Sequence, residues 1–454
     1  MTTILGWLFL ALATLQGGAA RSDLQAIRVG RAETVSHGAI EHAVILVEKG
    51  KIVAVGQDLA IERGIPVLER PEWTVMPGLV NVYSRLGLSS RAGVEFTPQV
   101  VASVELDPAD PVYDDLLETG TTTLCIYPPG TGVAGMAVAL RPQGDTREAM
   151  TVLSPAYLKI YFRSDARAKK MVRDAFAKVD EYIEKEKKAR EKWEKDQEKA
   201  KKKPADDKKG EEKKGEEKKG EEKKGEEKPK DGSAGYDAGA AQEPAVQDEK
   251  KPEKQDEAPK VYVPPEPDEK VKPFLDLRNK KLSALVSIGQ AGDWLHWLDA
   301  IGKEDFRWDL RVPMTRELDI FEVAAKIGEK GCRIVSEPEL TYHPGTLRLR
   351  NLPAELSRAG AKLVLIPRSD TLVGHERWLG HVGEIVAAGL PREVALKAVT
   401  LEAAGLLGLG ERLGSLDKGK DANLLFLSGD PLEAGTQVKA VMLEGRFVFG
   451  EVQQ

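Results

Sequence analysis

The chain has 454 residues, of which 41% are hydrophobic and 31% charged, and its formal net charge is −6. This length is too great for one ordinary small domain, but it accommodates an α/β barrel of roughly 250 residues together with a second domain. The acidic balance gives no basic face, which binding to the phosphates of nucleic acid requires, so we expect no nucleic-acid partner.

The first twenty residues are expected to form a signal peptide. An apolar run at residues 4–15 is followed by Gly-Gly-Ala-Ala at residues 17–20 and then by Arg21. Such a run is too short to cross a bilayer, and the small residues suit cleavage after Ala20. No Lys or Arg precedes the run, so an uncleaved anchor is the alternative. With cleavage, we predict a periplasmic or extracellular protein with no membrane span.

Short strand-like runs at both ends of the chain predict one composite β domain. The segment 24–76 holds a hairpin signal, Lys-Gly at residues 49–50, between two apolar runs. The segment 411–450 contains the strand-like runs 423–427 and 438–443. We predict that the two segments form one β-sandwich, which encloses everything between them.

The middle of the chain, residues 77–184 and 261–410, alternates strands with amphipathic helices. Strand–helix alternation of this length favours a parallel sheet, either closed as a barrel or open. The candidate strands are 121–127, 156–162, 282–288, 310–314, 332–336 and 361–366.

A polar segment at residues 185–260 interrupts this alternation. The motif KKGEE occurs four times between residues 208 and 227, and a period of five fits neither a heptad nor a solenoid. Glu and Lys three or four residues apart can support a helix to about Lys203, beyond which the regular glycines weaken it. We predict a disordered, solvated insertion, with a partner-binding tether as the alternative.

Several longer runs resemble the amidohydrolase superfamily, especially its exported branch near the imidazolonepropionase-like enzymes. They are GKIVAVG at 50–56 with VMPGLVNVYSRLG at 75–87, DPVYDDLLETGTTTLCIYPPG at 110–130, and a long ordered run from GLPREVALKAV to LSGDPL at 389–432. The resemblance implies a (β/α)8 TIM-like barrel with a composite β-sandwich built from both chain termini. It also implies a metal centre at the C-terminal mouth of the barrel strands, which would hydrolyse non-peptide carbon–nitrogen bonds.

The chemistry of such a centre sets which residues it needs. One or two divalent ions polarise a carbonyl and lower the pKa of a bound water to roughly 7. In this superfamily the ligands are a His-x-His pair after the first strand, a Lys or Glu on the fourth, single histidines on the fifth and sixth, and an Asp on the eighth.

Most of these ligand positions hold other residue types in this chain. Tyr83 and Arg85 stand where the resemblance places the His-x-His pair, and a guanidinium has no lone pair to give to a metal. The fifth-strand position falls near Ser287 and the sixth near Met314. We therefore expect no metal at this degenerate site.

Two ligand positions survive in the alignment. Lys159 falls where the strand-four lysine lies, and Asp370 matches the strand-eight aspartate that is also the family's general base. Each also has a purely structural interpretation: Lys159 as a lysine that reaches solvent, and Asp370 as a helix cap or an ion-pair partner. An ion pair between Arg85 and Asp370 would fill the space and the charge of the lost metal, and we predict that all six positions converge.

A relocated metal site is the alternative. His343, His375 and Asp370, with His381 as a further member, all follow predicted strands on the mouth side, and they could hold zinc or another divalent ion. These histidines lack ligand-type spacing, however, and loop histidines are usually surface residues.

The leading functional hypothesis is a non-catalytic, amidohydrolase-like protein that binds an unknown small ligand or a partner subunit, and that can form an oligomer. The alternatives are an active amidohydrolase that uses a single or relocated metal, and a metal-free enzyme that uses Asp370. The missing first-strand histidines favour the first hypothesis, because a strong zinc site needs three protein ligands. Fold alone does not establish activity.

Overall fold

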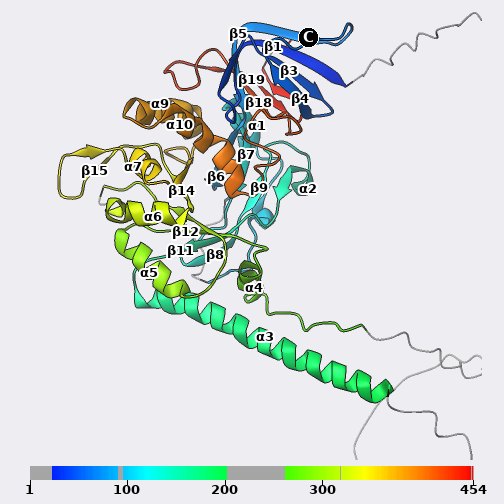
Figure 1. Ribbon diagram of the computed structural model, residues 1–454, viewed down its shortest axis with the longest axis vertical. Coiled ribbons are helices and arrows are strands. Elements are labelled where there is room, and N and C mark those ends of the chain that lie inside the picture. The colour runs from blue at the N-terminus through cyan, green and yellow to red at the C-terminus, as the bar shows by residue number, and fades with distance from the viewer. Residues whose placement is uncertain (1–22, 90–95, 202–260, 317, 451, 453–454) are drawn as a thin grey trace, which may run out of the picture. The chain divides into compact units, whose positions relative to one another are not determined.

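The computed structural model describes residues 23–89, 96–201, 261–316, 318–450 and 452 (Figure 1). The proposed signal segment, and the insertion beyond residue 201, lie outside these residues. The chain divides into two compact units: one comprises the residues up to 181 and from 267 onward, and the other comprises residues 182–266.

One sheet of the larger unit joins strands from both ends of the chain. Its order is β20-β19-β18-β5-β1-β3-β4, with β2 paired to β1. The link between the two ends is β18, which runs antiparallel to the last residues of β5. The strands are β1 (Leu24–Glu33), β2 (Ala39–Glu41), β3 (Val44–Glu48), β4 (Lys51–Gly56), β5 (Val67–Pro77), β18 (Leu424–Leu427), β19 (Val438–Leu443) and β20 (Arg446–Phe449).

Alternating apolar residues give this β-rich part a core of its own. Ile27 and Ile45, from the N-terminal strands, share one buried cluster with Leu424, Phe426 and Met442, from the C-terminal strands. All five side chains are fully buried. Neither end of the chain therefore buries its apolar face without the other.

The remaining strands form two further main sheets, in the orders β10-β9-β7-β6 and β17-β14-β13-β12-β11-β8. The run from β11 to β17 is parallel throughout, and β6 is parallel to β7. The strands are β6 (Leu79–Ser84), β7 (Thr121–Ile126), β8 (Val133–Met136), β9 (Val138–Leu140), β10 (Thr151–Leu153), β11 (Leu158–Tyr161), β12 (Ala284–Ser287), β13 (Trp308–Arg311), β14 (Arg333–Ser336) and β17 (Lys362–Leu365). A separate small hairpin joins β15 (Thr341–Tyr342) to β16 (Leu349–Arg350).

The strands β8 and β9 depart from the all-parallel pattern of the expected barrel. β9 runs antiparallel to β7, and β8 runs antiparallel to β11. Only residues 127–132 connect β7 to β8, whereas a parallel return needs a crossover of about a dozen residues or more. The short connection accounts for the reversed direction.

Helices connect the parallel strands, as a parallel sheet requires. α5, α6 and α7 follow β12, β13 and β14 in turn along the chain (Figure 1). The helices are α1 (Val112–Glu118), α2 (Arg147–Met150), α3 (Ala166–Lys201), α4 (Lys272–Arg278), α5 (Ala291–Ile301), α6 (Ala324–Lys330), α7 (Leu352–Arg358), α8 (Leu372–Glu376), α9 (Trp378–Ala387), α10 (Arg392–Val399) and α11 (Leu401–Leu406), with 3-10 turns η1 (Ala102–Glu105) and η2 (Ile320–Val323).

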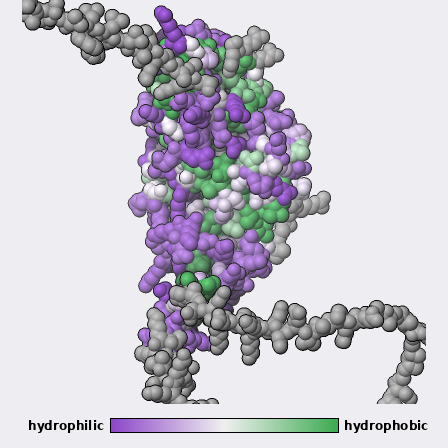
Figure 2. Space-filling model, turned by 90° about the vertical axis from the view of Figure 1, so that its right-hand side faces the viewer, coloured by the Kyte–Doolittle hydropathy of each residue, from purple (hydrophilic) through white to green (hydrophobic). Residues whose placement is uncertain are grey.

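A single apolar cluster receives side chains from both of these main sheets. Val80 of β6 and Cys125 of β7 pack in it with Leu285, Val335 and Val364 of β12, β14 and β17. The protein is therefore a mixed α/β fold with an additional β-rich part. The face shown in Figure 2 is mainly hydrophilic, with smaller hydrophobic areas between the polar ones.

The smaller unit consists of the second half of α3 and a returning segment. The Tyr262 hydroxyl donates to the carbonyl of Glu186 at 3.2 Å, and the rings of Tyr262 and Trp193 lie 5.7 Å apart. α3 continues to Lys201, so residues 185–201 of the segment for which composition predicts disorder are helical, as their Glu/Lys spacing allows. Within the described part of the chain, no helix combines the length and apolarity needed to cross a membrane.

Candidate functional site

The predicted site residues lie within, or a few residues after, strands of the α/β part. Tyr83 belongs to β6, Lys159 to β11, and Ser287 is the last residue of β12. Met314 and Asp370 follow β13 and β17 within a few residues. Parallel strands end at a common edge, so the sheet order brings these positions to the same end of the α/β part.

Two stacked tyrosines form the centre of the site, and cations surround them. The rings of Tyr83 and Tyr127 stack with their centroids 4.0 Å apart. Lys159 Nζ lies 4.1 Å from the Tyr127 centroid and 5.8 Å from that of Tyr83. Arg311 Cζ lies 5.3 Å from the Tyr83 centroid, and Arg85 Cζ lies 5.9 Å from that of Tyr127. Cation–π attraction therefore holds three basic side chains from three elements at one aromatic pair.

Lys159 is a buried amine with only weak polar contacts. Its residue is 6% exposed, and its ammonium donates to the carbonyl of Gly130 at 3.5 Å. Burial, with a smaller contribution from the positive charge of Arg85, lowers the pKa of Lys159 to about 8. No carboxylate among the described residues neutralises this lysine.

Arg311 is a member of the site that the sequence analysis did not identify. It is buried at the end of β13, where its guanidinium forms an ion pair with Glu337, just after β14. The other carboxylate oxygen of Glu337 accepts from the backbone N–H of Met314 at 3.1 Å. Met314 thus enters the site through its backbone, and Arg311 is the sixth-strand side chain at the tyrosines. The only sequence signal was an Arg and a Glu, each near the end of a candidate strand.

Asp370 binds the segment that follows β6. Its two carboxylate oxygens accept from Ser84 Oγ and from the backbone N–H of Arg85, both at 2.6 Å. Burial raises the pKa of Asp370. This effect outweighs the hydrogen bonds from Ser84 and the Arg85 backbone and the positive charge of Arg85, which all lower the pKa. The predicted association of Arg85 with Asp370 is therefore made through the backbone of Arg85.

Of the polar atoms at this end that are buried without hydrogen-bond partners among the described residues, two lie opposite each other. They are Ser287 Oγ and Arg311 Nε, on the neighbouring strands β12 and β13. Ser287 and Arg311 are direct partners in the register of these strands. Buried donors without partners are rare in folded proteins, so this pair marks a place where a further group can bind.

The structure does not assemble the alternative metal site. Both ring nitrogens of His375 are engaged, with Thr121 Oγ1 at 2.9 Å and Asn81 Nδ2 at 3.2 Å, and burial lowers its pKa to about 4. His343 Nδ1 lies 3.1 Å from Arg350 Nη1. Within the described ranges, no three His, Cys, Asp or Glu side chains are grouped to hold a metal. The described side chains therefore give no support to a relocated site from His343, His375 and Asp370, with or without His381, and that site stays a prediction.

The donor set at the strand ends does not fit the divalent metal that the resemblance implies. Such an ion needs neutral imidazoles and carboxylates. Here Arg85, Lys159 and Arg311 bring positive charge to the site, and both oxygens of Asp370 already accept hydrogen bonds. A dication placed among these side chains would be repelled rather than bound.

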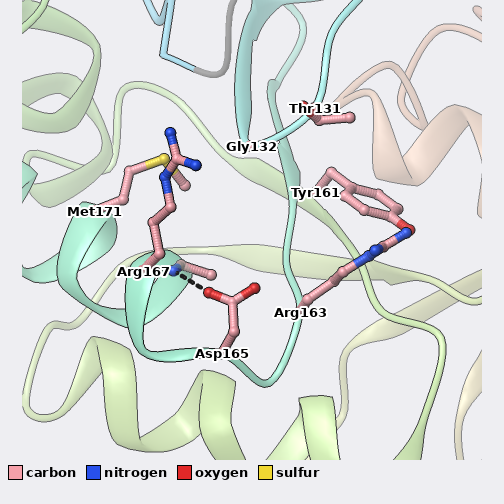
Figure 3. Close-up of a pocket in the computed structure, with 8 residues that line it drawn as sticks. Thr131, Gly132, Tyr161, Arg163, Asp165, Arg167 and Met171 are labelled. Atoms are coloured by element: carbon pink, nitrogen blue, oxygen red, sulfur yellow. Dashed lines mark hydrogen bonds between the residues drawn. The ribbon is translucent and has the colours of Figure 1, made fainter.

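Residues close to Lys159 in the sequence line a cavity of about 250 Å³ (Figure 3). Its walls include Thr131 and Gly132, which follow Gly130, and Tyr161, which lies two residues after Lys159 on β11. Arg163 lines it as well and donates to the Tyr161 hydroxyl at 3.0 and 3.1 Å. The cavity is therefore polar, and arginine side chains contribute to its wall.

Comparison with known proteins first concerns the C-terminal part of the chain. Residues 365–449 match the model of the amidohydrolase family. The chain is 41% identical over 68 residues to an imidazolonepropionase of Thermoplasma volcanium, and 38% identical over 63 residues to the amidohydrolase tasK of Hapsidospora irregularis. Each match covers 14% of this chain, and the matches span 17% and 6% of those relatives.

Solved structures extend the likeness to the whole fold. An amidohydrolase from Thermotoga maritima superposes with a TM-score of 0.69 at 20% identity, and the match covers 94% of this chain and all of that one. At this identity the likeness concerns the fold. The family match, the two relatives and the shared fold together place the chain in the amidohydrolase superfamily.

Proposed function

We propose that this protein is an amidohydrolase-like binding protein, which has lost metal-dependent catalysis and binds a small ligand or a partner subunit. One observation carries the proposal. At the strand ends where the superfamily holds a metal, this chain has Arg311 and Lys159, each within cation–π distance of the Tyr83 ring. A cluster of this kind fills the space of a metal centre and has the charge of one, but it cannot activate water as a bound dication does.

The proposal includes a barrel made from the two main α/β sheets. Eight strand positions follow in chain order: β6, β7, the pair β8 and β9, β11, β12, β13, β14 and β17. Only Ala137 separates β8 from β9, so these two strands together bridge the sheets, and both sheets contribute to one core. This arrangement supports a (β/α)8 barrel whose third position runs antiparallel.

The two enzymatic alternatives receive less support. A relocated metal would need at least three His, Cys, Asp or Glu side chains close together, and the described residues contain no such group. A metal-free enzyme would need Asp370 as a general base, which must reach the substrate's proton. Both Asp370 oxygens instead accept hydrogen bonds from the neighbouring segment.

Elemental analysis of the purified protein tests the proposal. We expect less than 0.1 equivalent of zinc, manganese, iron, cobalt or nickel after expression in metal-supplemented medium. The double variant Tyr83→His, Arg85→His should still bind no stoichiometric zinc, because the fifth- and sixth-strand ligands remain absent. A stoichiometric transition metal, together with hydrolysis of an amide or cyclic amide that Asp370→Ala abolishes, would overturn the proposal.

We further propose that the protein is exported. The apolar run at residues 4–15 and the small residues at 17–20 support this part of the proposal. N-terminal sequencing of the protein from a secreting host should begin at Arg21. An intact N-terminus on membrane-bound protein would instead favour an uncleaved anchor.

A further inference from the structure

Lys159 is a buried cation with no anionic partner among the residues that the structure describes. Its ammonium contacts the Gly130 carbonyl and the faces of Tyr127 and Tyr83. Buried charges in proteins are normally paired or bound to ions, because removing an ammonium from water is costly. An unpaired buried ammonium is therefore a place where an anion from outside the chain would bind favourably.

The carboxylates near Lys159 do not fill this role. Glu337 is bound to Arg311 and to the backbone of Met314. Asp370 is bound to Ser84 and to the backbone of Arg85. Each acid is thus committed to another group, and the described part of the chain leaves the charge of Lys159 unbalanced.

Ser287 and Arg311 add hydrogen-bond donors on the same face of the sheet. Lys159 is the register partner of Leu285, and Ser287 lies two residues further along that strand. Side chains two residues apart share a face, as do register partners, so Lys159, Ser287 and Arg311 all point inward. Ser287 Oγ and Arg311 Nε are both buried and have no hydrogen-bond partner among the described residues.

We propose that Lys159, Arg311 and Ser287 form a binding site for the oxyanion group of a small molecule, either a carboxylate or a phosphate. The three side chains offer an ammonium, a guanidinium N–H and a hydroxyl, and charge-assisted hydrogen bonds of this kind are the strong ones. The inference rests on the proposed function, because a metal at these strand ends would exclude it.

The neighbouring cavity provides room for the rest of such a molecule. Tyr161, which faces the same side of the sheet as Lys159, lines this cavity of about 250 Å³. Arg163 and Arg167 also line it, together with Asp165, so its charged wall residues are two cations and one anion (Figure 3). The volume restricts the ligand to a small organic anion.

Titration calorimetry on the full-length, metal-free protein tests the site with two probes, acetate and inorganic phosphate. We expect saturable binding of at least one probe and a Kd at least tenfold weaker in Lys159→Met. Ser287→Ala should weaken the same probe severalfold, and it removes no charge. The matched control is Lys439→Met in the β-rich part, where Lys439 contacts only Gln437 among the described side chains, and it should leave the Kd unchanged.

The outcomes separate this inference from the proposed function. Tighter binding of acetate identifies a carboxylate ligand, and tighter binding of phosphate identifies a phosphate ligand. Absence of saturable binding to metal-free protein, or equal affinity in Lys159→Met and wild type, overturns the inference and leaves the proposed function standing. Stoichiometric metal overturns both. Should Lys159→Met fail to fold, an unchanged Kd in Ser287→Ala overturns the site.

Discussion

Asp370 accepts a hydrogen bond from Ser84 Oγ at 2.6 Å, which ties the segment after β17 to the end of β6. Replacing Asp370 with Ala leaves Ser84 Oγ and the backbone N–H of Arg85 without their acceptor, which should cost about 1–3 kcal/mol in the free energy of unfolding. Asp370→Asn keeps one acceptor and should cost less. Urea unfolding at pH 7 measures both, and equal losses would show that the acceptor is unimportant.

The same carboxyl predicts a pH effect that the Asn variant should lack. The folded pKa of Asp370 is raised above its ordinary value, mainly by burial. The protonated form is thus favoured by folding, and this stabilisation is present below the unfolded pKa and lost as the pH rises through the folded one. The wild type should therefore lose stability relative to Asp370→Asn as the pH rises above about 4.

Replacement by Met should change the stability of the protein in opposite directions at Lys159 and at Arg311. Lys159→Met removes a buried ammonium that has no carboxylate partner, and its lowered pKa of about 8 corresponds to a penalty of up to about 3 kcal/mol at pH 7. Arg311→Met leaves the partly buried carboxylate of Glu337 without its cation, which should cost up to about 3 kcal/mol. We expect a higher midpoint of thermal unfolding for the first and a lower one for the second. A loss of stability in Lys159→Met would mean that its contacts with the tyrosines outweigh its desolvation.

His375 should make the protein acid-sensitive. Its folded pKa is lowered to about 4 by burial, while an unfolded histidine titrates near 6.5. The unfolded state therefore binds the additional proton, and stability falls by up to about 3 kcal/mol as the pH falls from about 6.5 to 4. Unfolding titrations of His375→Gln should lack this slope. His343→Gln, in which the altered residue is partly exposed, is the matched control and should keep it.

The strand positions were predictable because they depend on local pattern. The run 438–443 coincides with β19, and the run 423–427 contains β18. Apolar alternation and turn residues determine such segments without reference to the rest of the chain. The superfamily resemblance pointed to positions within or shortly after strands, and Tyr83 and Lys159 meet in the structure.

The partners inside the site were not predictable in the same way. Arg311 and Glu337 are separated by 26 residues, and only the adjacency of β13 and β14 brings them together. His375 follows Asp370 closely, yet α8 turns its ring to Thr121. Which side chains pair depends on which strands are neighbours and on which way each helix turns its side chains. Neither can be read directly from a single sequence.

The polar segment beyond α3 should be dispensable for folding. Its composition offers almost nothing to bury, and the chain on either side is already joined by the contact of Trp193 with Tyr262. Replacing residues 202–260 with a Gly/Ser linker of about eight residues should leave the thermal midpoint within about 2 °C of the wild type. A fall of many degrees would show that the segment packs on the folded protein.

The two ends of the chain should fold only together. β18 supplies the neighbour of the last residues of β5, and Phe426 is fully buried among the N-terminal strands. Removing all residues after Gly419 takes away β18, β19 and β20, and thereby exposes the apolar faces of β1 and β5. We expect this truncation to be aggregated, or to lack a cooperative unfolding transition by circular dichroism. Phe426→Ala tests the same contact more mildly and should cost about 3–5 kcal/mol, whereas Phe447→Ala, at a partly exposed position, should cost less. A soluble truncation that unfolds cooperatively would show that the N-terminal strands form a domain of their own.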